Sequence, residues 1–136
     1  MTRDQVLAII EKVQIGYLAT VDADNAPRVR PVFIKDVYDD ELYFFTFSTT
    51  RKVAEIEANP QVEVVWADVE NNSQARISGK AVMVEDEAMH KRFLNDNPNA
   101  ARIIPERARH LFTLYKIQPE RVEGAEGLVS YTGIEW

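Results

Sequence analysis

The sequence predicts a mainly β protein in which an antiparallel sheet of about six strands curls into a small barrel, with helices inserted between the strands. Several segments of strand length are rich in β-branched and aromatic residues. Tight turns or one short helix join most of them, whereas a parallel sheet would need regular helical crossovers. The 136 residues, 46% of them hydrophobic, suit one domain spanning residues 1–136.

The chain is expected to open with a helix over residues 2–13. Thr2 and Gln5 have the spacing of a capping box. Apolar residues then recur at the i, i+3, i+4, i+7 spacing of one helix face, at Val6, Ile9, Ile10 and Val13.

Three strands are predicted next, over residues 15–21, 27–36 and 42–48. The first is apolar and follows the pattern of a buried strand, and the second alternates between two faces. Pro31 cannot donate a hydrogen bond to a neighbouring strand, so the second strand is expected to lie at an edge of the sheet or to be irregular near this residue. Only a tight turn separates it from the aromatic-rich third strand, so these two are expected to pair as a hairpin.

The second half of the sequence is expected to contain both strands and helices. A short helix is expected over residues 50–58, ended by Asn59 and Pro60. The remaining expectations are strands over 61–69, 74–84 (with a bulge at Gly79) and 111–124, a helix over 85–96, irregular or short helical pieces over 97–110, and a further short strand within 128–136.

Composition excludes several classes of protein. The net charge of −6 argues against a general nucleic-acid binder, because phosphate contacts require a basic face. The absence of cysteine excludes disulfides, zinc–thiolate sites and thiol nucleophiles. The first residues do not form a signal peptide, and no apolar run is long enough for a membrane helix. We therefore expect a soluble cytoplasmic protein.

Chemical motifs are scarce. The chain contains no Gly-x-Gly-x-x-Gly, Walker or Gly-x-Ser-x-Gly pattern. Its two histidines, His90 and His110, lie on unrelated segments, so no metal site is expected. No catalytic side chain can be assigned from the sequence.

One group of basic and hydroxyl residues remains. Arg28 and Arg30 share one face of a strand. Ser48, Thr49 and Thr50 precede Arg51 and Lys52, which open a predicted helix where the dipole disfavours cations. A phosphate at this helix N-terminus would remove that conflict. An ordinary N-cap followed by solvated cations fits the same residues, so the residues alone leave both interpretations open.

The order and spacing of several segments resemble the FMN-binding split β-barrel family related to pyridoxamine 5'-phosphate oxidase, which includes general stress proteins. The resemblance is carried by GYLATVDADNAPRVRPV (16–32), LYFFTFSTTRKVAEIEANPQVEVVW (42–66), QARISGKAVMVED (74–86) and LYKIQPERVE (114–123). It implies a single split-barrel domain and a homodimer with FMN held at the subunit interface.

Carried over by position, the resemblance implies a set of cofactor-binding residues. The stretch Arg28, Val29, Arg30, Pro31 and Val32 would lie along the isoalloxazine and the phosphate. Thr46 would contact the flavin, Arg51 and Lys52 would bind its phosphate, and Gln74 would lie near the ring. Ser48, Thr49 and Thr50 fit the phosphate end by their own spacing. Tyr131 or Trp136 would either stack on the ring across the dimer or have ordinary surface or core roles.

The resemblance does not determine the reaction. The tail lacks the Arg-x-His segment that closes over the vitamin in the namesake oxidases, so a vitamin B6 oxidase is not expected. The first hypothesis is an FMN-dependent oxidoreductase acting on an unidentified small molecule, with a pyridine nucleotide as a second possible reactant. The alternatives are a non-catalytic flavin-binding or stress and redox-sensing protein, and a split barrel that uses a deazaflavin cofactor or haem.

Overall fold

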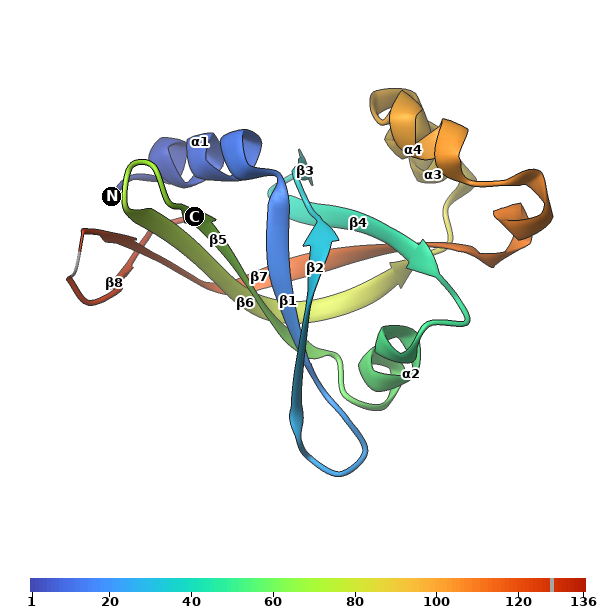
Figure 1. Cartoon of the computed structure of the whole chain (residues 1–136), viewed down its shortest axis with the longest axis horizontal. Helices are drawn as coiled ribbons and strands as arrows, with labels where there is room; N and C mark the ends of the chain where they lie inside the picture. Colours follow the sequence, from blue (N-terminus) through green and yellow to red (C-terminus); the bar gives the residue numbers. More distant parts are fainter. Residues whose placement is uncertain (128) are drawn as a thin grey trace.

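The computed structural model describes residues 1–127 and 129–136 and shows one antiparallel sheet flanked by helices (Figure 1). Eight strands form the sheet in the order β2-β1-β5-β6-β7-β4-β3, with β8 paired to β7. The elements are α1 (Arg3–Val13), β1 (Ile15–Val21), β2 (Pro27–Phe33), β3 (Asp36–Tyr38), β4 (Glu41–Phe47), α2 (Arg51–Ala58), β5 (Gln61–Asp68), β6 (Ser73–Val84), α3 (Glu87–Asp96), α4 (Pro98–Ile103), the 3-10 helix η1 (Glu106–Leu111), β7 (Phe112–Glu126) and β8 (Thr132–Gly133).

The predicted fold class is confirmed, and the predicted strand count is too low. The sheet curls without closing, because its edge strands β2 and β3 do not pair with each other. The expected strand 27–36 is divided into β2 and the start of a separate short strand, β3. The expected tail strand is present as β8, and the part of that expectation that falls on residue 128 lies outside the described residues.

The expected hairpin between residues 27–36 and 42–48 is wrong. β2 folds back on β1, with Thr20 opposite Arg28 and Leu18 opposite Arg30. β4 instead pairs with β3 and with β7. The tight turn at Asp39 and Asp40, both with positive φ, therefore joins β4 to β3 alone. Pro31 does lie on an edge strand, as its missing N–H predicts.

Local signals at α1 and at Gly79 are confirmed. Thr2 caps α1, and Gln5 completes the capping box. The register of β6 against β7 shifts between Ser78 and Gly79. A Cβ at Gly79 would lie 2.0 Å from the backbone oxygen of Gln118, so only glycine allows this close approach of the two strands.

The helices α3, α4 and η1 follow β6. The predicted helix 85–96 is present as α3, capped by Asp86, and the short helical pieces predicted around two prolines are α4 and η1. Figure 1 shows α3 and α4 together, away from α1 and α2. Within residues 1–127 and 129–136, no helix is both long and apolar enough to cross a membrane.

The hydrophobic core lies inside the curled sheet and beneath α1. It includes Trp66, Phe44 and Tyr115, each almost fully buried. The indole Nε1 of Trp66 donates a 2.9 Å hydrogen bond to the backbone oxygen of Ile34, which fixes the chain just after β2. This bond and the β1–β2 ladder set the position from which Arg30 extends.

Candidate functional site

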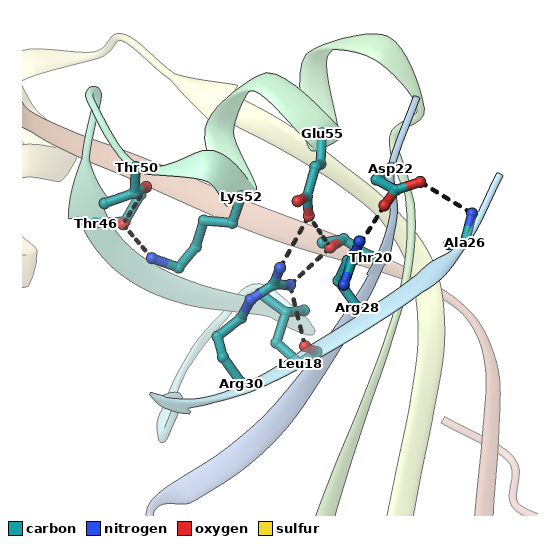
Figure 2. Close-up of polar contacts among 10 residues, drawn as sticks. All are labelled: Leu18, Thr20, Asp22, Ala26, Arg28, Arg30, Thr46, Thr50, Lys52 and Glu55. Carbon is teal, nitrogen blue, oxygen red and sulfur yellow. Dashed lines mark hydrogen bonds and ion pairs between the residues drawn. The ribbon is translucent and has the colours of Figure 1, made fainter. Parts of the chain in front are cut away.

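Side chains from β1, β2, β4 and α2 meet at one end of the sheet (Figure 2). The group, called here the Lys52 cluster, consists of Thr20, Arg30, Thr46, Thr50, Lys52 and Glu55. The expected meeting of Arg30 with Lys52 therefore occurs, although β2 and β4 are not paired as a hairpin. The curl of the sheet brings the two strands together.

Lys52 lies in the first turn of α2 and extends toward β4. Its Nζ donates a 2.8 Å hydrogen bond to the buried Thr46 hydroxyl. Burial lowers the pKa of Lys52, and the nearby Arg30 charge lowers it further, while Glu55 acts in the opposite direction. No carboxylate in the described part of the chain forms an ion pair with Lys52. Its half-buried charge is therefore only partly compensated.

Arg30 is held by groups on two elements. Its Nη1 donates to the Thr20 hydroxyl at 2.7 Å and to the Leu18 backbone oxygen at 3.3 Å. Its Nη2 lies 2.8 Å from the Glu55 carboxylate, which also accepts a hydrogen bond from Thr20. These bonds hold the pKa of Glu55 below its usual value, the Thr20 bond contributing most. Arg30 is thus fixed in direction beside Lys52.

The N-terminus of α2 lacks the usual cap. Thr50 occupies the N-cap position, but its side chain makes no capping bond; its hydroxyl donates to the Phe47 backbone oxygen at 2.9 Å and lies 3.2 Å from the Thr46 hydroxyl. The first turn of α2 carries no acidic residue. Backbone N–H groups at a helix start that has no side-chain cap are available to an anion.

The other predicted site residues near β2 and the start of α2 lie outside the Lys52 cluster. Ser48 and Thr49 are exposed in the turn after β4, and Arg51 is exposed at the first position of α2. Arg28 forms a 2.8 Å ion pair with Asp22 in the β1–β2 turn, and that turn's hydrogen bonds, together with Arg28, lower the pKa of Asp22. The remainder of the β2 stretch consists of Val29 and Pro31, exposed on the outer face, and Val32, which packs against the core.

Gln74 is not brought to the Lys52 cluster within one chain. It lies opposite Ala67 near one end of the β5–β6 ladder, whereas Lys80 and Gln61 mark the other end. β1 meets β5 with Ala19 opposite Glu63, near that second end. Six residues of strand between Gln74 and Lys80 correspond to about 20 Å. Gln74 instead accepts a hydrogen bond from the Tyr131 hydroxyl.

The two aromatic residues of the tail make contacts within the chain. The Arg76 guanidinium lies 3.8 Å from the centre of the Tyr131 ring. The indole of Trp136 donates a 2.8 Å hydrogen bond to the backbone oxygen of Asp40.

Sequence reasoning missed Glu55 and Thr20. A signal for Glu55 was present, because a residue three positions after Lys52 lies on the same side of a helix. Thr20 gave no such signal, since a hydroxyl in an apolar strand predicts nothing about its partner.

Comparison with known proteins supplies the family. A family model described as pyridoxamine 5'-phosphate oxidase matches residues 2–125. The chain belongs to the pyridoxamine 5'-phosphate oxidase family. One family relative is the pyridoxine/pyridoxamine 5'-phosphate oxidase of Haemophilus influenzae, 38% identical over 86 residues, which are 63% of this chain and 40% of that protein. The chain matches less than half the length of each of the pyridoxine/pyridoxamine 5'-phosphate oxidases to which it is similar.

Solved structures share the fold. General Stress Protein 26 of Bacillus anthracis aligns with a TM-score of 0.77 and 23% identity, covering 96% of each chain. A pyridoxamine 5'-phosphate oxidase-related, FMN-binding protein of Nostoc punctiforme aligns with a TM-score of 0.68 and 18% identity, covering 91% of this chain and 83% of that one. At these identities the likeness establishes the split-barrel fold of the family.

Proposed function

We propose that this protein binds FMN, with the cofactor's phosphate held by the Lys52 cluster, and that it is an oxidoreductase acting on a small molecule. The observation that carries the proposal is the half-buried Lys52 ammonium, which bonds to a hydroxyl, lacks a carboxylate partner in the described residues and lies beside a second cation, Arg30. Because Glu55 already pairs with Arg30, a phosphate would offset the charge left on Lys52, and charge-assisted bonds to phosphate are among the strongest in proteins.

The residues present fit that anion. Lys52 and the uncapped start of α2 would bind phosphate oxygens, and Thr46, whose hydroxyl oxygen accepts the Lys52 bond, has a proton of its own that it would donate to the phosphate. Glu55 and Thr20 would hold Arg30 toward the same anion. The exposed Arg51 would add attraction from the solvent side. When bound, FMN itself supplies the hydride or electron transfer, so the protein's task is to bind and orient it.

We further propose that the working unit is a homodimer. The outer face of the β1–β2 hairpin is apolar, with Ile15 opposite Phe33 and Tyr17 opposite Pro31, and Val29 completes it. Exposed fractions on this face reach 67% at Val29 and 58% at Phe33. Contact with a second copy of the chain would remove these apolar side chains from water. The separation of Gln74 from the Lys52 cluster is consistent with Gln74 reaching the flavin from the partner.

The absorption spectrum of the purified protein is the first test. A flavin spectrum, or its appearance on adding FMN, is expected. A haem or deazaflavin spectrum would show that the protein binds that cofactor instead of FMN. A colourless protein that takes up no FMN would exclude FMN as the cofactor.

Activity and assembly need separate tests. Bound FMN should be reduced by NADH or NADPH, or by a small-molecule donor, faster than free FMN. No gain with any donor tried would favour a non-catalytic flavin-binding or redox-sensing role. Sedimentation should give a dimer, and Phe33→Lys should give monomers that bind FMN weakly. A monomeric wild-type protein with tight FMN binding would exclude the dimer.

A further inference from the structure

A cavity of about 420 Å³ lies between the β2–β3 connection, β4 and the α3–α4 pair. Its apolar walls are Phe33, Phe45, Phe93 and Ile103. The ring centres of Phe45 and Phe93 are 6.0 Å apart. A volume in this range with aromatic walls suits a small organic molecule.

The cavity shares two strands with the site proposed for FMN but lies on their opposite face, because neighbouring side chains of a strand alternate between faces. Phe45 is adjacent to Thr46 on β4, and Phe33 is adjacent to Val32 on β2. The same two strands therefore contribute both to the cavity and to the Lys52 cluster. A molecule in this cavity would therefore meet a flavin whose ring extends past the edge strand β2.

The polar groups of the cavity carry a net negative charge. Asp36 and Asp96 line it together with a single cation, Lys35. The Lys35 ammonium lies 3.4 Å from Asp36, whose other carboxylate oxygen accepts a 3.1 Å bond from the Asn97 amide. Asp36 is nearly buried, so its charge is poorly solvated, and burial raises its pKa.

Asp96 supplies the second carboxylate of the cavity wall. It accepts a 2.6 Å hydrogen bond from the Tyr38 hydroxyl. A nearby cation, Arg92, lies against the Tyr38 ring at 4.0 Å and does not line the cavity. The lining thus has no cation free to bind a phosphate, although phosphate is the group that the substrates of the Haemophilus relative carry, by its name.

We propose that this cavity is the substrate site and that it takes a small aromatic molecule bearing a protonated amine and no phosphate. The phenylalanine walls would bind the ring, and Asp96 and Asp36 would bind the amine. The assignment as a substrate site rests on the proposed FMN function. The preference for an amine over a phosphate does not, because it depends only on the cavity's own charges.

The test compares two probes of similar size, benzylamine and phenyl phosphate, by calorimetry on the FMN-loaded protein. Benzylamine should bind at least about tenfold more tightly, the lower value for a charge-assisted bond. Asp96→Asn keeps an acceptor for Tyr38 and should reduce benzylamine affinity about twofold to fivefold, because Asp96 is exposed and solvent screens its charge. Glu87→Gln, an exposed change on the same helix, should leave it unchanged.

Several results would overturn the proposal. They are equal or tighter binding of phenyl phosphate, benzylamine affinity unchanged in Asp96→Asn, and benzylamine binding that FMN loading abolishes, which would mean that the flavin itself fills the cavity. If the protein takes up no FMN, the proposed function fails, and the same comparison on cofactor-free Lys52→Ala protein, in which phenyl phosphate cannot use the Lys52 ammonium, still decides the charge preference.

Discussion

The guanidinium of Arg30 on β2 lies 2.8 Å from the carboxylate of Glu55 on α2, and the Thr20 hydroxyl on β1 bonds to both. This contact joins β2 to α2, although β3 and β4 lie between them in the chain. It leaves Lys52, one helical turn before Glu55, as the cation of the cluster without a carboxylate partner in the described residues. The arrangement separates a fixed cation from one available to a ligand.

Lys52→Ala should weaken FMN binding by roughly tenfold to a hundredfold, because a charge-assisted bond contributes about 1.5–3 kcal/mol. Riboflavin affinity should change little, since riboflavin has no phosphate. Fluorescence titration with both flavins measures the difference. Lys80→Ala changes an exposed lysine on β6 and serves as the control. Equal losses of affinity for the two flavins would show that Lys52 does not bind the phosphate.

Arg51→Ala should produce a smaller loss than Lys52→Ala in the same titration. Its side chain is exposed, and solvent and salt screen exposed charges. The loss should shrink further as salt is added, whereas the Lys52 effect should persist. A larger effect for Arg51→Ala would place the phosphate outside the cluster.

FMN binding should take up protons at alkaline pH. Burial and Arg30 lower the pKa of Lys52 in the free protein, and a neighbouring phosphate would raise it again. Between these two pKa values the free protein has neutral Lys52 and the complex has charged Lys52. Calorimetry in buffers of different ionisation enthalpy should detect this uptake in wild-type protein and not in Lys52→Ala. Heats independent of the buffer throughout the alkaline range would contradict it.

Glu55→Gln should lower the free energy of unfolding near neutral pH by about 1–3 kcal/mol, the cost of leaving a partly buried charged partner unsatisfied. The pKa of Glu55 is lowered in the folded state, so its contribution is complete above the unfolded-state pKa of about 4.3 and is lost as pH falls through the folded value. Urea unfolding at neutral and acidic pH should therefore show the two proteins converge in acid. Glu57→Gln, an exposed change on the same helix, should have no comparable effect, and a constant difference at both pH values would refute the assignment.

Gly79→Ala should destabilise the fold by about 1–3 kcal/mol or more, because the new Cβ would overlap the backbone oxygen of Gln118 at the bulge. Gly133→Ala places a Cβ in open space and should be nearly neutral. Urea unfolding of the two variants provides the comparison. Similar stabilities would mean that β6 and β7 can move apart at little cost.

Local features of the fold were predictable because their causes are local. The capping box at Thr2 and Gln5, the edge position of Pro31 and the bulge at Gly79 each follow from one residue's backbone chemistry. The pairing of β2 was predicted wrongly, because short loops connect it in both directions and the loops do not decide the partner. The bond from Trp66 to Ile34 helps to fix β2 beside β1, and no local pattern announces it.

The candidate site was predictable to a similar extent. The sequence identified Lys52, Arg30 and the neighbouring hydroxyls by their conflict with the helix dipole. It could not show that Arg30 and Arg28 have different partners, Glu55 and Asp22, because alternation places both on one strand face and says nothing of what lies opposite. The distance of Gln74 from the cluster likewise depends on the sheet register.

The long strand β7 joins the two parts of the sheet. β2, β1, β5 and β6 lie on one side of it, and β4 and β3 lie on the other. Thr46 is carried by β4, while Arg30 is carried by β2, so the cluster's two sides belong to different parts. During synthesis the first part of the sheet can assemble as soon as β6 has emerged, but β4 has no partner in it until residues 112–126 follow. In a growing chain the two sides of the anion site are therefore joined through the sheet only after residues 112–126 have left the ribosome.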